Sequence, residues 1–240
     1  MSIRCFTVER STSVRRSLRR YASRWNYDST PAKNLLPCPA RGGEYSCHDE
    51  SVLIDTIEVP IPVGLETDER ITQGDFWPHD DERWPRVCRC GYEFKDVDFW
   101  QLATDRLWLR PDTGELLSLG ELPPGAMYHA DWMLIEGTDH YRGPDGHSLV
   151  VILPDNTPWN IDGRANNCDS PCAECGVPYL SHKYELCQSY RDARPHKCWV
   201  RHGQAPNITV DKNGVTCGAG AGSIATRNYH GFLRNGEFTN

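Results

Sequence analysis

Residues 147–162 read His-Ser-Leu-Val-Val-Ile-Leu-Pro-Asp-Asn-Thr-Pro-Trp-Asn-Ile-Asp. The apolar, β-branched run at 147–153 predicts a buried strand. The Pro-Asp-Asn sequence at 154–156 then favours a turn, because proline fixes φ and the other two residues tolerate tight backbone geometry. The chain returns at 159–162, so this stretch predicts two neighbouring strands in a β-rich fold.

The same signals recur on both sides of this stretch. Two apolar runs flank the turn sequence Pro-Asp-Thr-Gly at 111–114, which is typical of a β-hairpin. A second hairpin is predicted at 229–238 around Asn-Gly, the strongest short hairpin signal. Further strands are predicted at 3–9, 51–60 and 197–202.

A short helix is predicted directly after the first strand. Ser11 or Thr12 would cap its N-terminus, since both side chains can accept a hydrogen bond from the first turn. Four arginines would then share one face of this helix: Arg15, Arg16, Arg19 and Arg20. We expect this basic face to be solvated rather than to bind phosphate or an acidic partner.

Together these patterns predict an α+β protein, predominantly antiparallel β, with short helices and a cysteine-rich zinc-binding insert. Four segments are expected along the chain. They are an N-terminal strand–helix–strand region at 1–60, a β-rich core with a C-x-C segment at 61–165, the insert at 166–195, and a C-terminal β segment completing the core at 196–240.

Composition excludes several classes of protein. The net charge of −7 argues against a protein that coats nucleic acid. No apolar run approaches the roughly 20 residues of a membrane span. The N-terminus lacks the apolar segment of a signal peptide, so the eleven cysteines are expected to meet a reducing cytosol. An odd cysteine count in that setting favours metal binding over disulfides.

The predicted insert contains a compact cysteine and histidine pattern. Its order, C-x2-C-x6-H-x4-C, suits a zinc loop, because a C-x2-C turn presents two thiolates to one ion. The alternative is that these are cysteines in a loop without a metal. Four protein ligands would make the site closed and structural. The predicted ligands are Cys172, Cys175, His182 and Cys187.

A second zinc set can be assembled from the remaining residues of this region. Its members would join the edges of the insert to the strands that follow, and ligands can also be exchanged between the two sets. The alternative is that Cys198 and Cys217 are ordinary buried thiols. The candidate ligands are Cys168, His196, Cys198 and Cys217.

A third concentration of metal-binding residue types lies nearer the N-terminus. A C-x-C pair with nearby histidines can hold a structural metal, whereas only three protein ligands would leave the open position of a hydrolytic zinc. A nucleophilic cysteine beside a histidine is the other alternative. We expect a structural role. The candidates are Cys47, His48, His79, Cys88 and Cys90, together with Cys38, Asp49, Asp80 and Asp81.

Several segments together resemble a group of uncharacterised proteins encoded by bacteriophages of actinobacteria and by related prophages. The resemblance covers most of the chain apart from 24–76 and 169–195. It implies a source and a context but supplies no activity. The segments are RCFTVE (4–9), WPHDDERWPRVCRCGYEF (77–94), PPGAMYHADWM (123–133), GPDGHSLVVILPDNTPWNIDGRANNC (143–168), HKCWVRHGQAPNITVDKNGVTCGAGAGSI (196–224) and YHGFLRNGEF (229–238).

In the C-terminal part, a Pro-rich strand is followed by a hairpin sequence of the form His-Gly-x-x-Arg-Asn-Gly, at 230–236. This part also resembles a broader domain family of unknown function whose members occur beside ubiquitin-like conjugation genes in bacteria. No catalytic residue carries over from that likeness. We therefore expect a zinc-stabilised, phage-encoded accessory protein that binds a protein partner in the cytoplasm of the bacterial host. It should bind neither membranes nor nucleic acid in general. The alternatives are a zinc- or cysteine-dependent hydrolase, which would use the third set, and a virion component of capsid or tail.

Overall fold

The computed structural model describes residues 2–22, 38–39, 48–59, 77–134, 141–163, 165, 197–212 and 222–239. These residues fall into two units, one made from 2–9 and 108–239 and the other from 10–107. Both boundaries between described residues lie within strands, and the first unit is assembled from two parts of the chain that are far apart in sequence. The division into four consecutive segments expected from the sequence remains a prediction.

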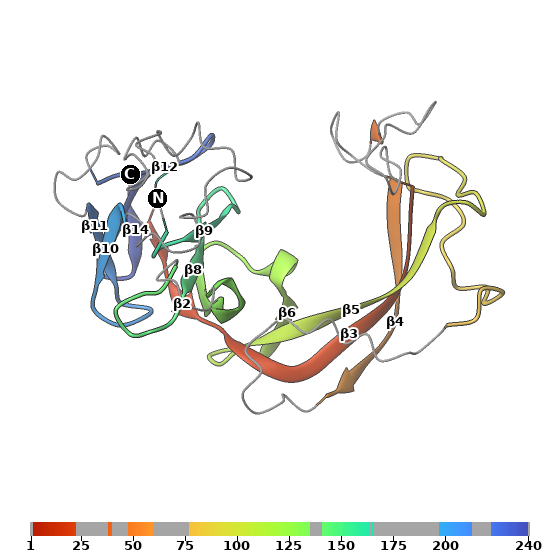
Figure 1. Cartoon of the computed structure of the whole chain (residues 1–240), viewed down its shortest axis with the longest axis horizontal. Helices are drawn as coiled ribbons and strands as arrows, with labels where there is room; N and C mark the ends of the chain where they lie inside the picture. Colours follow the sequence, from red (N-terminus) through yellow and green to blue (C-terminus); the bar gives the residue numbers. More distant parts are fainter. Residues whose placement is uncertain are drawn as a thin grey trace, which may run out of the picture. The chain divides into compact units, whose positions relative to one another are not determined.

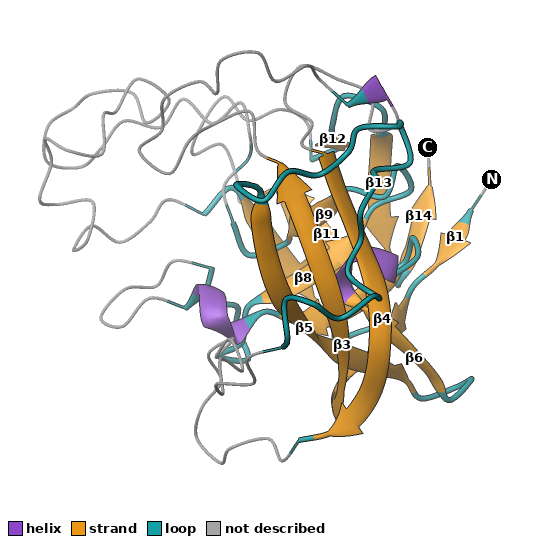
Figure 2. Cartoon of the chain, turned by 90° about the vertical axis from the view of Figure 1, so that its right-hand side faces the viewer, coloured by secondary structure: helices purple, strands orange, loops and turns teal. Residues whose placement is uncertain are grey.

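The described chain is mostly β-structure, and nearly all of its strand pairs are antiparallel, as predicted (Figure 2). One pair, β2 with β7, is parallel. Within the described ranges there is no α-helix. The short helices found there are of the 3-10 type, η2 (Leu119–Glu121) and η3 (Asp131–Met133).

One sheet has the strand order β4-β3-β5-β6. Its three long strands lie side by side in Figures 1 and 2. The last two strands form the hairpin predicted around 111–114, in which Gly114 has φ +75° and closes the turn on Arg110. The strands are β3 (Glu9–Ala22), β4 (His48–Glu58), β5 (Phe99–Arg110) and β6 (Glu115–Ser118).

The helix predicted after residue 10 is wrong, because this segment is strand β3. The buried residues Val14 and Leu18 are four positions apart, which suits one face of a helix and also one face of a strand. The long antiparallel pairing with β4 decides between the two. A bulge between Arg16 and Ser17 shifts the register of this pairing.

The predicted basic face is wrong for the same reason. Arg16 donates two hydrogen bonds to Asp55 on β4, at 2.8 and 2.6 Å. Arg19 makes an equivalent pair with Asp49, at 2.9 and 2.6 Å. Arg20 is 2% exposed. These three arginines are therefore held within the unit by partners of their own.

Arg20 lies among aromatic rings and backbone carbonyls. Its guanidinium carbon is 3.5 Å from the ring centroid of Trp100 and 5.5 Å from that of Phe94. It also donates a 2.6 Å hydrogen bond to the carbonyl of Lys95. Such cation–π contacts are strongest when the cation is shielded from water. The arginine thus joins β3 to the loop that precedes β5.

The other unit contains smaller sheets built around two buried clusters. One sheet, in the order β2-β7-β8-β9, includes the predicted strand at 147–153 and its return strand. All four residues of β8 are buried, as its continuous apolar sequence indicates. The strands are β2 (Phe6–Thr7), β7 (Ala126–His129), β8 (Leu149–Ile152) and β9 (Pro158–Asn160).

Two further sheets complete this unit, in the orders β1-β14-β13-β12 and β10-β11. The chain ends lie side by side because β1 pairs with β14 (Figure 1). Asn235 and Gly236 both have positive φ, as the predicted Asn-Gly hairpin requires. The strands are β1 (Ile3–Arg4), β10 (Trp199–His202), β11 (Thr209–Lys212), β12 (Ile224–Ala225), β13 (His230–Arg234) and β14 (Glu237–Thr239).

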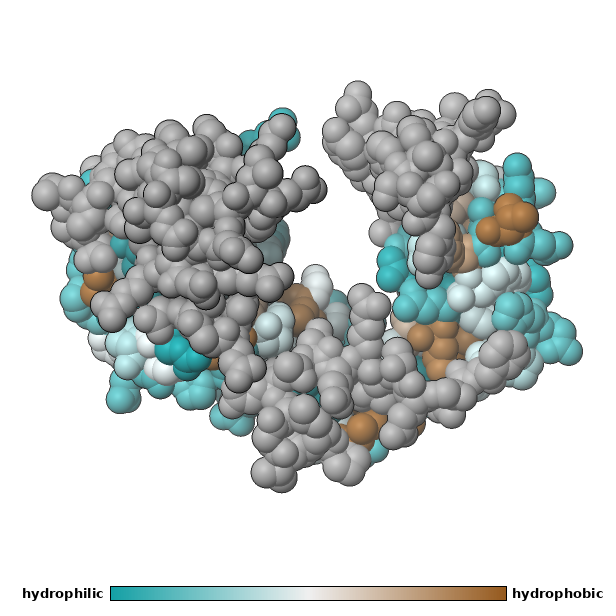
Figure 3. All heavy atoms as spheres, in the orientation of Figure 1, coloured by the Kyte–Doolittle hydropathy of each residue, from teal (hydrophilic) through white to brown (hydrophobic). Residues whose placement is uncertain are grey.

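Large hydrophobic side chains are seldom exposed among the described residues. On the face shown in Figure 3 they form separate patches among hydrophilic ones. Two of them, Val52 and Leu53, follow one another on β4, which is an edge strand of the described sheet. The exposed large hydrophobic residues are Val52, Leu53, Val87, Val97, Leu116 and Leu119.

Candidate metal centre

Four metal-binding side chains come together in the unit that contains β3 and β4. His48 is the first residue of β4, and Cys38 lies in the short described segment at 38–39. Cys88 and Cys90 belong to the loop between residue 77 and β5. One ligand atom from each side chain lies within 4.8 Å of every other. These residues can therefore hold a metal ion.

A tight turn presents the two loop cysteines to the cluster. The backbone N–H of Gly91 donates to the carbonyl of Cys88 at 2.7 Å, and that of Cys88 donates to the carbonyl of Tyr92 at 2.8 Å. Gly91 has φ +90°, a conformation that side chains with a Cβ rarely adopt. The sequence Cys-Arg-Cys-Gly therefore encodes the turn as well as the ligands.

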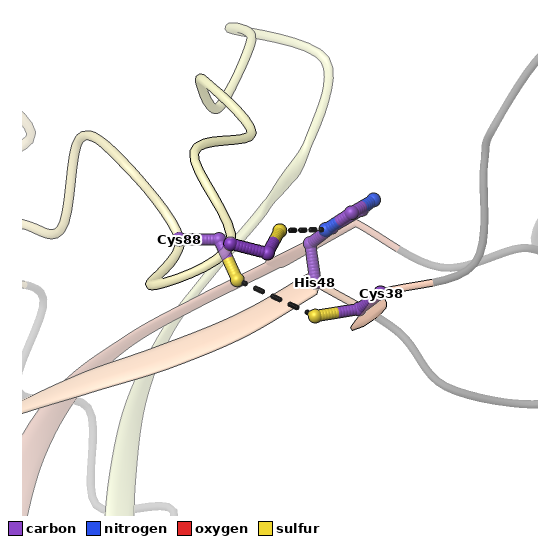
Figure 4. A group of neighbouring side chains, drawn as sticks. Cys38, His48 and Cys88 are labelled. Atoms are coloured by element: carbon purple, nitrogen blue, oxygen red, sulfur yellow. Dashed lines mark hydrogen bonds between the residues drawn. The ribbon is translucent and has the colours of Figure 1, made fainter. Parts of the chain in front are cut away.

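The spacing of the ligand atoms suits a single small ion (Figure 4). The sulfurs of Cys38 and Cys88 are 3.7 Å apart, and Nδ1 of His48 is 3.2 Å from the sulfur of Cys90. A disulfide would bring two sulfurs to about 2.05 Å. Two sulfurs that each lie about 2.3 Å from a tetrahedral zinc ion are about 3.8 Å apart. The observed sulfur separation matches the second arrangement.

The cluster is shielded from water. Cys38, His48 and Cys88 are 0%, 3% and 2% exposed, and Cys90 is partly buried. The ring of Tyr92 stacks on His48 with 4.0 Å between centroids and 7° between planes. Phe94, from the same loop, is clustered with Cys38 and Cys88. Burial on this scale favours a structural site, because little room is left for water or substrate.

Two of the thiols differ in their acidity. Burial raises the pKa of the Cys88 thiol to about 11. A hydrogen bond from the backbone of Tyr92 lowers the pKa of the Cys90 thiol. A bound divalent cation overrides such differences, since a coordinating thiol loses its proton outright. Metal binding would therefore release protons from this cluster.

A carboxylate and an arginine support the loop next to the ligands. Glu50 accepts hydrogen bonds from the backbone N–H and the Nε of Arg89, both at 2.9 Å. Its Oε1 is also 3.5 Å from the sulfur of Cys88. The hydrogen bonds from Arg89 lower the pKa of Glu50 to about 2, so the carboxylate is charged at neutral pH. This pair ties the turn to β4.

The third predicted set is thus partly assembled. His48, Cys88 and Cys90 lie together, joined by Cys38, whereas His79 is not part of the cluster. Its ring instead lies 5.5 Å from that of Trp100 and 6.3 Å from that of Trp84. Cys47 lies outside the described residues.

Most of the predicted ligands in the insert and around it also lie outside the described residues, so those two zinc sites remain predictions. Cys198 is described, and it is buried in the core that contains β8. The residues outside are Cys168, Cys172, Cys175, His182, Cys187, His196 and Cys217.

A second group that can hold a metal ion, formed by His129, Asp131 and His147, is not predicted from the sequence. The two histidines are eighteen positions apart, and no spacing motif joins them. From the sequence, the strand at 147–153 is expected to pair only with its return strand. It also pairs with β7, which carries His129, and this pairing is the information that would have placed the two histidines together.

No family model matches the chain, and no curated protein or solved structure shows significant similarity to it. Among the described residues, no helix is both long and apolar enough to cross a membrane. Function is therefore inferred from the geometry of the side chains.

Proposed function

We propose that the protein is a zinc-stabilised accessory protein encoded by a phage, and that it binds a protein partner without catalysing a reaction. The buried cluster of three thiols and one imidazole carries the zinc assignment. Soft thiolates with imidazole in a tetrahedral arrangement are the ligands typical of structural zinc. The ligands are Cys38, His48, Cys88 and Cys90.

A zinc- or cysteine-dependent hydrolase is the alternative for these same residues. A hydrolytic zinc needs three protein ligands and one position for water. Here four protein side chains converge, and three of them are almost completely buried. A nucleophilic cysteine would also need a path for substrate. The geometry therefore favours the structural role over the catalytic one.

Metal analysis tests the zinc assignment. We expect Cys88→Ser and Cys90→Ser each to lose one equivalent of zinc relative to the wild type when purified without chelator. Cys5→Ala is the matched control, because Cys5 is a buried thiol in the other unit. It should retain all of the wild-type zinc. Wild-type zinc content in both serine variants would refute the assignment.

The edge strand β4 is the proposed site for the partner. An edge strand offers unpaired backbone groups to another extended chain, and aliphatic side chains beside them add apolar contact. Leu53 is 56% exposed and Val52 is 37% exposed. We propose that the protein meets this partner in the cytoplasm of the bacterial host, as the resemblance to phage proteins implies, with assembly into a virion as the alternative.

A photo-crosslinking amino acid at position 53 tests this surface in host cells. We expect one defined protein to be captured there and to be lost from pull-downs with Leu53→Lys. The control places the same amino acid at Val97, which is 87% exposed in a loop of the same unit. Equal capture from both positions, or unchanged pull-down with Leu53→Lys, would refute the proposed surface.

A further inference from the structure

Two histidines meet where β7 and β8 pair. His129 ends β7 and lies opposite Leu149 in the antiparallel register. His147 comes two residues before Leu149, which makes it the diagonal neighbour of His129. The two rings stack with 4.5 Å between centroids and 2° between planes. The strand pairing thus holds two imidazoles against each other.

A carboxylate completes this group. Asp131 follows β7 at the start of η3, and its Oδ2 is 2.8 Å from Nδ1 of His147. One ring nitrogen from each histidine and one carboxylate oxygen all lie within 4.8 Å of one another. His129 is exposed, whereas the other two residues are partly buried. One side of the group therefore faces solvent.

The backbone around the group is fixed by several hydrogen bonds. The N–H of Ser148 donates to Oδ1 of Asp131 at 2.9 Å, which orients the carboxylate. The N–H of Ala130 donates to the carbonyl of Ser148 at 2.7 Å. Support of this kind holds ligands in place before an ion binds.

A buried arginine adds to this support. Arg201, whose side chain is 2% exposed, donates to the carbonyl of His147 at 3.3 Å. It also forms ion pairs with Asp145 and Asp162. The N–H of His147 in turn donates to Asp145 at 3.0 Å. The chain carrying His147 is therefore anchored to the core.

We propose that His129, Asp131 and His147 bind a divalent transition-metal ion that keeps open coordination positions. Two imidazoles and one carboxylate suit zinc, iron or cobalt. Ligands about 2.1 Å from one ion lie at most about 4.2 Å apart. The ligand atoms must therefore move slightly closer together when the ion binds, and the exposed ring of His129 makes this movement. The open positions face solvent and accept water or a small oxygen- or nitrogen-donor ligand, in contrast to the closed thiolate cluster.

Cobalt binding tests this site separately from the thiolate centre. Protein whose thiolate centre holds zinc and whose remaining sites are free of metal is titrated with Co²⁺. It should bind one equivalent that shows visible d–d bands without a sulfur-to-cobalt charge-transfer band. Azide should change these bands, because an open ion accepts it. His129→Ala and His147→Ala should each abolish this binding, and Asp131→Asn should weaken it at least about tenfold.

Two control variants accompany this experiment. His230→Ala removes another exposed histidine of the same unit, and it should bind cobalt like the wild type. Cys88→Ser should also retain cobalt binding at the two histidines and the aspartate. The cobalt result can therefore be interpreted even if the proposed zinc centre is wrong. Absence of the sulfur-free cobalt spectrum in the wild type would overturn the proposal. Equal loss in His230→Ala, or a spectrum indifferent to azide, would do the same.

Discussion

Individual residues in this protein differ in role even where their chemistry is the same. His48 and His79 are both histidines of one unit, yet one faces three thiols and the other packs between tryptophans. Sequence proximity to cysteines does not distinguish them. What separates them is the position of each residue relative to β4 and to the loop before β5.

Replacing each of these histidines should give a different result. His48→Ala removes a ligand, so we expect it to lose one equivalent of zinc. His79→Ala should retain the zinc and lose about 0.5–1.5 kcal/mol of stability through its aromatic contacts. Metal analysis and denaturant unfolding of both variants measure the two effects. Zinc loss in His79→Ala would contradict the separation.

The pair formed by Arg16 and Asp55 predicts a pH dependence. The hydrogen bond from Arg16 lowers the pKa of Asp55 in the folded protein. Its contribution to stability is therefore present above the unfolded pKa of about 3.9 and is lost as pH falls through the folded value. Asp55→Asn should be less stable than the wild type at neutral pH by less than about 1 kcal/mol, because the pair is partly exposed.

The difference in stability between Asp55→Asn and the wild type should vanish at low pH, where Asp55 is protonated in both the folded and the unfolded protein. Urea unfolding at several pH values measures it. Release of metal by acid affects both proteins equally, so the comparison measures only the contribution of the Asp55 carboxylate to stability. A difference that stays constant down to the lowest pH would contradict the assignment.

Part of the candidate site could be predicted from residues alone. The Cys-x-Cys pair and His48 stood out because few solvated loops concentrate such side chains. Cys38 belongs to the same candidate set, but its separation of 50 positions from Cys88 matches no spacing of metal ligands. Tertiary packing brings these two residues close together in space although they are far apart in sequence.

At the scale of elements, the β-hairpins follow from local chemistry. The turns at 111–114 and 235–236 are predicted correctly because their residues favour the required backbone angles. Strand β3 is misread because its charged residues and four-residue apolar spacing suit a helix equally well. Its pairing with β4 on one side and β5 on the other makes it a strand, and local propensity does not contain that information.

The C-terminal hairpin offers a test of this view. Gly236 has φ +70°, and a Cβ at this position would collide with the carbonyl oxygen of Pro206. Gly236→Ala should therefore cost at least about 1 kcal/mol. The control Asn235→Gly should be well tolerated, since φ at 235 is already positive. Thermal unfolding compares both with the wild type, and equal melting of Gly236→Ala would contradict the close contact.

At the scale of the whole molecule, the two units differ in how they are stabilised. Among the described residues, the unit containing β8 has two large buried clusters, whose members include Met127, Leu149 and Phe238 in one and Val8 and Tyr128 in the other. In the described part of the other unit, the cluster around the candidate metal ligands has four buried members: Ala22, Cys38, Cys88 and Phe94. Metal binding should therefore matter more to that unit.

Hydrogen exchange measured by mass spectrometry can show this difference. Cys88→Ser should increase exchange at 10–22, 48–59 and 77–107, because loss of the ion removes a major stabilising contact. Exchange in β7 and β8 should stay at the wild-type level. A uniform increase over the whole described chain would indicate that the two units unfold together.

The distance in sequence between Cys38 and Cys88 has a thermodynamic consequence. An ion shared by both residues closes a loop of 50 positions, much as a covalent cross-link does. It differs from a covalent cross-link in that the ion dissociates when the unit unfolds, because the unfolded chain no longer holds these ligands together. The benefit exists only while the ion is bound. Above the dissociation constant, stability then rises by about 1.4 kcal/mol for each tenfold increase in free metal. The persistence of this unit in a cell would thus depend on the supply of available zinc.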